Sequence, residues 1–167
     1  MKKITINKKS LIWKIALVIL FVLLDLVTKN FFMQYFASGN SEISILSGFL
    51  TFTYYENSGA AFGSFSDSTV MLTIISIVFV IVFIIIDLFQ NDNSKLYITS
   101  FSLIIAGAVG NMIDRIALHY VRDFIKLSIF NFVFNIADAC ICIGVFLYIL
   151  NVIISEFRKT KGEKNID

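Results

Sequence analysis

Long apolar runs dominate the pattern of hydrophobic and polar positions along this chain. Four of them extend over about 20 residues, and charged side chains interrupt them only rarely. Because an α-helix rises about 1.5 Å per residue, a run of this length crosses a hydrocarbon core about 30 Å thick. The pattern therefore predicts four membrane-spanning helices, at about residues 11–32, 70–90, 96–116 and 132–157.

A different pattern occurs between the first two runs. The stretch "FLTFTYY" alternates aromatic residues with small or β-branched ones, which is typical of a β-strand, and turn residues flank it on both sides. We expect a small β-cradle at about residues 38–66, with its aromatic side chains at the level of the lipid headgroups. The predicted fold class is an all-α membrane protein with four transmembrane helices and a small extracytoplasmic β-cradle, in a single integral membrane domain over residues 1–167.

Composition strengthens the membrane interpretation and excludes several functions. The 167 residues are 57% hydrophobic and 16% charged, whereas an ordinary soluble domain is about 25% charged. The chain has one histidine, His119, and no H-E-x-x-H pattern, so zinc hydrolysis lacks its ligands. The sequence contains no Gly-rich phosphate loop and no basic nucleic-acid footprint. We therefore expect no metal, no cofactor and no nucleic-acid partner.

The distribution of Lys and Arg predicts the orientation in the membrane. Both residue types gather before the first run and after the last, whereas residues 33–69 contain neither. Because cytoplasmic loops are rich in Lys and Arg, both termini should be cytoplasmic, with residues 33–69 and 117–131 outside. Arg122 and Lys126 in the second outer segment run against this rule locally, and the other loops outvote them.

Ionisable residues within a membrane span are costly and are therefore candidates for function. Asp25 and Lys29 lie four positions apart on one helix face, so they can neutralise each other inside the bundle. A contact between Lys29 and a reacting group is the alternative. Asp87 lies at the cytoplasmic end of the second run, where we expect it to reach water.

The outer end of the third run carries two polar side chains on one helix face, Asn111 and Arg115. They either serve a site or, in the case of Arg115, anchor the helix to lipid phosphate. Ala106 and Gly110 in the same run are small residues four positions apart, which allow a neighbouring helix to approach closely.

Two aspartates lie in and after the last outer segment. Asp123 lies in that segment and Asp138 lies 15 residues later, in the outer half of the fourth run, with Asn135 on the same helix face. If the segment folds back, the two carboxyl groups face each other and share a proton, so that one activates water while the other polarises a carbonyl. Spacing alone leaves open a relay of cations or protons, or a scaffold without activity.

Five stretches resemble, in the same order, the motifs of lipoprotein signal peptidase (signal peptidase II), the membrane aspartyl peptidase of bacteria. The resemblance covers about residues 11–157. The five stretches are "DLVTK" from Asp25, "NSGAAFG" from Asn57, "GAVGNMIDR" from Gly107, "VRDFI" from Val121 and "FNIAD" from Phe134.

The resemblance implies a fold, a site and a substrate. It implies four transmembrane helices with an extracytoplasmic β-cradle, in the bacterial cytoplasmic (inner) membrane. The substrate would be a prolipoprotein with diacylglyceryl on its lipobox cysteine, cleaved just before that cysteine by a monomer. Membrane lipids and globomycin-type inhibitors would be further partners. The implied catalytic dyad is Asp123 and Asp138, and the residues implied to line or support the site are Asn57, Gly59, Asn111, Arg115, Asn135, Asp25 and Lys29.

The chain departs from the family pattern at a few positions. Leu26 stands where Gln is usual, and Phe132 stands where Pro is frequent. His119 stands where Gly is common, and histidine tolerates a positive φ better than most residues. The stretch between Asp123 and Asp138 is a few residues shorter than usual. None of these departures removes a residue that the chemistry needs.

Overall fold

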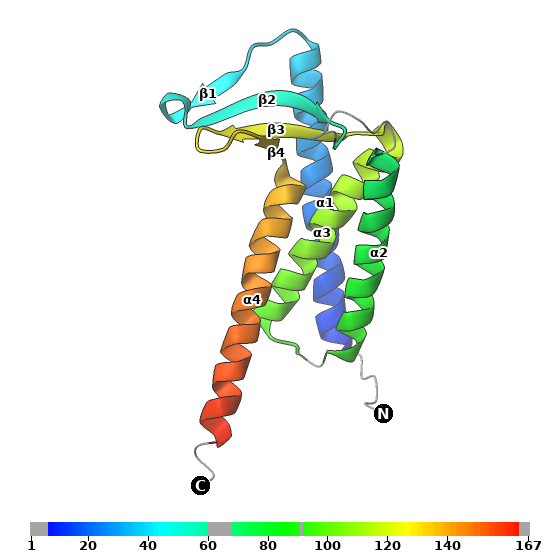
Figure 1. The fold of residues 1–167 in the computed structure, drawn as a ribbon, viewed down its shortest axis with the longest axis vertical. Coiled ribbons are helices and arrows are strands. Elements are labelled where there is room, and N and C mark those ends of the chain that lie inside the picture. The colour runs from blue at the N-terminus through cyan, green and yellow to red at the C-terminus, as the bar shows by residue number, and fades with distance from the viewer. Residues whose placement is uncertain (1–6, 60–67, 91, 164–167) are drawn as a thin grey trace.

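Four long helices form the body of the protein (Figure 1). The computed structural model describes residues 7–59, 68–90 and 92–163. All four helices are long and apolar enough to cross a membrane, which confirms the predicted spans. The last helix begins at Ile136 rather than near residue 132, because the residues before it form a strand and a helix cap. The helices are α1 (Lys8–Ala37), α2 (Ser68–Phe89), α3 (Lys95–Leu118) and α4 (Ile136–Glu163).

Helix α3 is the centre of the bundle, because it packs against α1, α2 and α4. Most of its span is buried, whereas α2 exposes most of its apolar side chains. Small residues permit the close packing of α3. A Cβ atom on Gly110 would lie 2.6 Å from Oδ2 of Asp25 and 3.3 Å from Cβ of Ala137. The close helix approach predicted at Gly110 is therefore confirmed, and it involves both α1 and α4.

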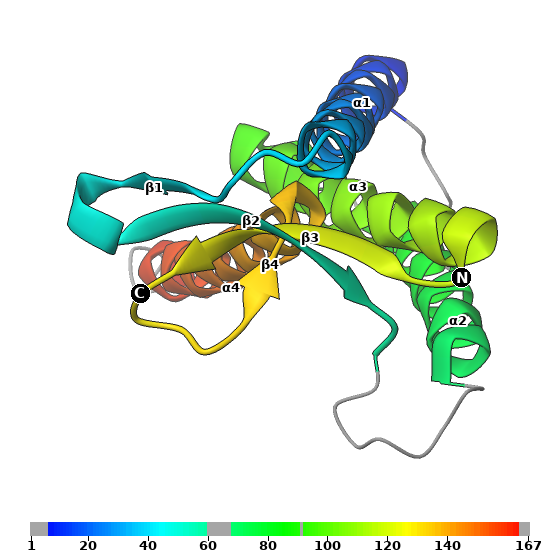
Figure 2. The same cartoon turned by 90° about the horizontal axis from the view of Figure 1, so that it is seen from above.

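A four-stranded antiparallel sheet covers one end of the bundle (Figures 1 and 2). The strand predicted from "FLTFTYY" is confirmed as part of β2. The sheet extends beyond the predicted residues 38–66, however, because β3 and β4 come from the segment between α3 and α4. The first four residues of β3 are buried on both faces, so no polar alternation marked this strand. The strands, in spatial order, are β1 (Ile43–Ile45), β2 (Leu50–Asn57), β3 (Val121–Leu127) and β4 (Val133–Phe134), with a 3-10 turn at Leu46–Gly48.

Stacked aromatic rings dock the sheet onto α1. The ring of Phe32 lies between those of Phe52 on β2 and Phe124 on β3, with centroid distances of 4.8 Å and 4.5 Å. Phe124 is almost fully buried in this contact. Its neighbour Asp123 pairs with Tyr55 across the ladder between β2 and β3. The stack therefore fixes the position of β3, and with it that of Asp123, relative to α1.

His119 ends α3 in the left-handed conformation, with φ 65°. Its backbone N–H donates to the carbonyl oxygen of Arg115 at 3.2 Å, and its own carbonyl accepts the hydroxyl of Thr69 at 2.9 Å. Histidine thus takes the conformation for which glycine is common at this position. The chain turns directly from α3 into β3, so the replacement leaves the approach to Asp123 intact.

Candidate active site

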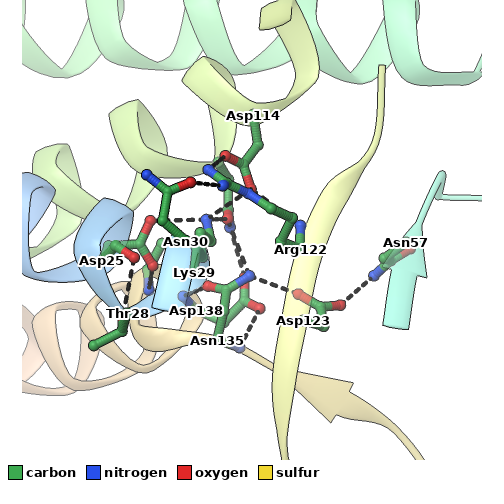
Figure 3. Close-up of polar contacts among 12 residues, drawn as sticks. Asp25, Thr28, Lys29, Asn30, Asn57, Asp114, Arg122, Asp123, Asn135 and Asp138 are labelled. Atoms are coloured by element: carbon green, nitrogen blue, oxygen red, sulfur yellow. Dashed lines mark hydrogen bonds and ion pairs between the residues drawn. The ribbon is translucent and has the colours of Figure 1, made fainter. Parts of the chain in front are cut away.

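The carboxyl groups of Asp123 and Asp138 meet around Asn135, beneath the sheet (Figure 3). Asp123 extends from β3, and Asp138 lies in the first turn of α4. The Asn135 side chain donates from Nδ2 to Oδ1 of Asp123 at 2.6 Å, and its backbone N–H donates to Oδ2 of Asp138 at 3.3 Å. The outer segment therefore folds back, which the sequence left open as a condition, and one residue contacts both carboxylates.

Local sequence explains how α4 tolerates Asp138. Asn135 caps the helix, because its Oδ1 accepts the backbone N–H of Asp138 at 2.9 Å, while the carboxylate of Asp138 accepts the backbone N–H of Asn135. This reciprocal arrangement is a capping box. A carboxylate in the first turn is also stabilised by the positive end of the helix dipole. The aspartate that seemed to interrupt a span thus lies at the beginning of its helix.

Asp123 is buried, and its second oxygen also receives a hydrogen bond. Asn57 donates from Nδ2 to Oδ2 of Asp123 at 2.8 Å. The amide oxygen of Asn57 in turn accepts the backbone N–H of Gly59 at 2.9 Å, and Gly59 adopts φ 77°. Burial, followed by the negative charge of Asp138, raises the pKa of the Asp123 carboxyl to about 6, although the hydrogen bond from Asn57 lowers it.

Asn111 supplies a donor to the other carboxylate. Its Nδ2 donates to Oδ1 of Asp138 at 2.7 Å. Its Oδ1 accepts from Nζ of Lys29 at 2.9 Å and from Nδ2 of Asn135 at 3.2 Å. Three asparagine side chains, from β2, α3 and the cap of α4, therefore point amide N–H groups at the pair of aspartates.

The predicted pair of Asp25 and Lys29 forms inside the bundle. Nζ of Lys29 lies 2.7 Å from Oδ2 of Asp25, and both side chains are almost fully buried. Oδ1 of Asp25 also accepts the backbone N–H of Ala137 at 2.8 Å, which ties α1 to the first turn of α4. Self-neutralisation is therefore confirmed. Lys29 also donates a hydrogen bond to Asn111, and the side chain of Asn111 in turn donates to Asp138.

Sequence analysis missed a second buried ion pair, between Asp114 and Arg122. Nη2 of Arg122 lies 2.6 Å from Oδ1 of Asp114, and the backbone N–H of Arg122 donates to Oδ2 at 3.0 Å. Arg122 also donates to Oδ1 of Asn30, and Nζ of Lys29 lies 3.3 Å from Asp114. Arg122 directly precedes Asp123, so this clamp fixes β3 against α3 and α1. The available signal was the position of Asp114, three residues after Asn111 on the same helix face.

The remaining predicted site residues differ in what the structure describes. Arg115 is half-buried near the end of α3, and its charge interacts with those of Asp138 and Asp123. Residues 60–63 of the "NSGAAFG" motif fall outside the described residues. Among those described, no three His, Cys, Asp or Glu side chains gather as metal ligands would. The roles of these residues and the absence of a cofactor stay predictions.

A second polar cluster lies at the opposite end of the bundle, and it corrects one expectation. Asp87 does not simply reach water: Nζ of Lys14 lies 2.5 Å from its Oδ1, and the hydroxyl of Tyr97 donates to the same oxygen at 2.8 Å. Lys14 also lies 4.9 Å from the ring centres of Tyr97 and Phe101. We call Lys14, Asp87 and Tyr97 the distal cluster. Its members come from three helices, so no local spacing indicated it.

Comparison with known proteins identifies the family. A family model described as "Signal peptidase (SPase) II" matches residues 17–154. A lipoprotein signal peptidase from Clostridium tetani is 38% identical over 144 residues, which are 84% of this chain and 92% of the relative. A lipoprotein signal peptidase from Halalkalibacterium halodurans is 37% identical over 154 residues, which are 90% of this chain and 96% of the relative.

Solved structures agree with the sequence comparison. A bacterial membrane enzyme solved by the in meso method at 2.3 Å resolution matches with a TM-score of 0.75 and 30% identity, over 95% of this chain and 96% of that one. A second bacterial membrane enzyme, solved at 1.9 Å, matches with a TM-score of 0.74 and 31% identity, over 91% and 97%. The protein is thus a multi-pass membrane peptidase, and the chain belongs to the signal peptidase II family.

Proposed function

We propose that this member of the signal peptidase II family is an aspartic endopeptidase with Asp123 and Asp138 as its catalytic pair. It removes the signal peptide from prolipoproteins. The observation that carries the catalytic assignment is the position of Asn135, which donates one hydrogen bond to each carboxylate. Two carboxyl groups held around one residue can share a proton and act on one water molecule.

The pair can hydrolyse a peptide bond with this shared proton. Asp123 holds it, because burial raises the pKa of Asp123 to about 6. Asp138 takes a proton from water as the water oxygen attacks the scissile carbonyl carbon, and Asp123 gives its proton to the carbonyl oxygen. Asp138 then protonates the leaving nitrogen, Asp123 takes a proton back from the intermediate, and the C–N bond breaks. A carboxylic acid and an amine leave, and the pair returns to its starting state.

The substrate is a prolipoprotein that carries diacylglyceryl on its lipobox cysteine, and cleavage falls just before that cysteine. The site lies where the apolar helices meet the sheet, so a peptide anchored by acyl chains can enter sideways from the lipid. The exposed apolar side chains of the four spans provide the surface along which such chains lie. Membrane lipids are therefore partners, globomycin-type peptides are inhibitors, and the whole chain acts as one monomeric membrane domain.

On this proposal the protein lies in the bacterial cytoplasmic membrane with both termini in the cytoplasm. The Lys and Arg distribution supports this orientation. The beginning of α1 and the end of α4 also lie at the same end of the bundle, away from the sheet (Figure 1). Reporters fused after Lys95 and after Asp167 should report cytoplasm, and one fused near Ser41 should report the outside. A cytoplasmic signal near Ser41 would overturn the orientation.

A proton or cation relay is the alternative from another functional class. A conduction path needs polar groups through the full depth of the membrane. Among the ionisable residues, α2 contributes Asp87 alone, and Lys14 and Tyr97 already engage its Oδ1. The polar groups around Asp123 gather at the other end of the bundle, which favours hydrolysis over conduction.

Release of the signal peptide from a synthetic diacylglyceryl lipobox peptide in detergent tests the catalytic assignment. Asp123→Asn and Asp138→Asn nearly preserve side-chain shape but remove the ability to ionise. Each should lose nearly all cleavage, and the double variant should be hardly worse, because the two groups act as a unit. A chelator should have no effect on the unaltered enzyme. Substantial cleavage by a well-folded Asp138→Asn protein would contradict the assignment.

A further inference from the structure

We infer that Lys29 is a positioning residue that fixes which end of the Asn111 amide faces Asp138. The inference rests on the proposed function, because it assigns Lys29 a part in preparing the catalytic pair. This role is separate from the ion pair with Asp25, which needs only a positive charge at position 29. It is carried by the hydrogen-bonding capacity of the groups that surround the buried ammonium.

The ammonium of Lys29 has three protons and no acceptor. Three oxygens surround it: Oδ1 of Asn111 accepts a hydrogen bond at 2.9 Å, and carboxylate oxygens of Asp25 and Asp114 form ion pairs at 2.7 Å and 3.3 Å. The side chain is fully buried, so water cannot replace any of them. The amide oxygen of Asn111 must therefore face Lys29, because an NH₂ group in that position would place one donor against another.

This requirement decides the orientation of Asn111. Its Oδ1 accepts from Lys29 at 2.9 Å and from Asn135 at 3.2 Å, which leaves Nδ2 to donate to Asp138 at 2.7 Å. In the reversed orientation, the NH₂ group of Asn111 would face the N–H donors of Lys29 and Asn135. Its amide oxygen would face the carboxylate of Asp138. Each of these contacts is unfavourable, so Lys29 effectively allows one orientation.

The other two asparagines are oriented in a different way. The amide oxygen of Asn57 accepts the backbone N–H of Gly59, and that of Asn135 accepts the backbone N–H of Asp138. Those donors are backbone groups, so replacing a neighbouring side chain such as Lys29 leaves them in place. Asn111 alone among the three is oriented by side-chain donors, and the charged donor is Lys29 (Figure 3 shows Lys29 beside this network).

The orientation affects the chemistry through the charge of Asp138. An N–H donor stabilises an ionised carboxylate, whereas a facing oxygen favours the protonated form. The ionised form is the one that can take a proton from water. Losing the orientation should therefore reduce kcat by about 10- to 100-fold near neutral pH, as expected for a hydrogen bond to a charged group. The acidic limb of the rate profile should move to higher pH, with little change in KM.

The test uses the pair of variants Asp25→Asn and Asp25→Asn/Lys29→Met in the full-length protein. The first keeps Lys29 and its contact with Asn111. The second removes both charges together, so that no unpaired carboxylate remains at position 25. Asp25→Asn should lower the rate, because it weakens the contact with the first turn of α4, but it should leave the acidic limb of the profile in place; the double variant should move that limb to higher pH. A purely structural Lys29 predicts the same profile for both.

A measurement that needs no activity separates this inference from the proposed function. The side-chain ¹⁵NH₂ signal of Asn111 should respond to Asp138→Asn in the unaltered background and lose that response when Lys29 is absent. If the variant with Lys29→Met does not fold, Asp25→Asn/Lys29→Gln gives a second test, because it removes the charged donor at Asn111 while a polar side chain stays in the buried site. An unshifted pH profile in either folded variant, or an Asn111 signal that still responds to Asp138→Asn without Lys29, overturns the inference.

Discussion

The two ends of the helical bundle each bury charged side chains, but they balance them differently. In the distal cluster one cation, Lys14, meets one anion, Asp87, and a tyrosine hydroxyl completes the contact. The charges cancel within the cluster, and its members tie α1, α2 and α3 together. Such a cluster stabilises the arrangement of helices and has no group left over for chemistry.

The end beneath the sheet contains a similar set of paired charges and, in addition, two carboxyl groups. Asp25, Lys29, Asp114 and Arg122 provide two anions and two cations in mutual contact. Asp123 and Asp138 stand beside this set and receive hydrogen bonds from neutral amide groups instead. The charge of Arg115 interacts with both carboxylates, but neither carboxylate belongs to any of the ion pairs found among the described residues. The comparison teaches that paired charges tie the helices and the sheet together here, while the two carboxylates left unbalanced by any ion pair are the ones to which we assign the reaction.

The largest expected effect is on the rate of cleavage, and it compares the same substitution at the two ends of the bundle. Asp138→Asn should reduce cleavage of a diacylglyceryl lipobox peptide by at least about 10³-fold, because it removes one half of a unit that acts together. Asp87→Asn makes the same chemical change at the other end and should leave the catalytic rate near that of the unaltered enzyme. The assay is initial rate in detergent, at matched amounts of folded protein. A comparable loss in both variants would end the distinction between a structural and a catalytic cluster.

The next effect concerns stability and compares one cation from each end. Arg122→Met leaves Asp114 buried with Lys29 at 3.3 Å, and should lower the free energy of unfolding by about 3–5 kcal/mol. Lys14→Met should cost less, about 1–3 kcal/mol, because Asp87 is partly exposed and keeps its tyrosine donor. Thermal denaturation in one detergent measures both. Equal losses would show that depth of burial does not distinguish the two clusters.

The third effect follows from the raised pKa of Asp123. Folding raises this pKa from 3.8 to about 6, so the folded protein binds the proton more tightly than the unfolded chain. The stabilising contribution is complete below about pH 4, and it is lost as the pH rises through about 6. Asp123→Asn cannot ionise, so its stability relative to the unaltered protein should rise by up to about 3 kcal/mol between pH 4 and pH 8. A difference in melting temperature that does not vary with pH would argue against a buried, titrating Asp123.

Sequence predicted the parts of this molecule that depend on local patterns. Four apolar runs indicated four spans, and the alternation in "FLTFTYY" indicated a strand. The spacing of Asp25 and Lys29 within one helix indicated an ion pair, because partners four residues apart always share a face. The family motifs named the pair of aspartates before any geometry was known.

Contacts between distant segments were not predictable in the same way. Lys14 and Asp87 are 73 residues apart, and their meeting depends on how α1 and α2 pack against α3. Arg122 was read as an exception to the charge rule of the loops, because nothing in its own neighbourhood shows that Asp114 lies within reach. Strand β3 lacks alternation for the same reason: its burial on both faces is decided by helices and strands elsewhere in the chain.

The smallest expected effect tests how a backbone conformation reaches the catalytic pair. Gly59 adopts φ 77° and its N–H orients the Asn57 amide, which donates to Asp123. Gly59→Ala should cost about 1–2 kcal/mol of stability, because a Cβ atom disfavours a positive φ. The displaced N–H should also loosen Asn57, so cleavage should fall by about 10-fold or less and the pKa of Asp123 should rise further.

Gly39 supplies the matched control for this variant. It has φ 81° in the turn after α1, and a Cβ atom built there meets nothing within 4 Å. Gly39→Ala therefore imposes the same backbone strain away from Asn57, and should lower stability by a similar amount with no change in the pH–rate profile. If both alanine variants cleave the lipobox peptide equally well, the turn at Gly59 only ends β2 and does not govern the hydrogen bond to Asp123. A loss confined to Gly59→Ala, with a shifted pH profile, places the turn among the features that keep the unbalanced carboxylates ready to react.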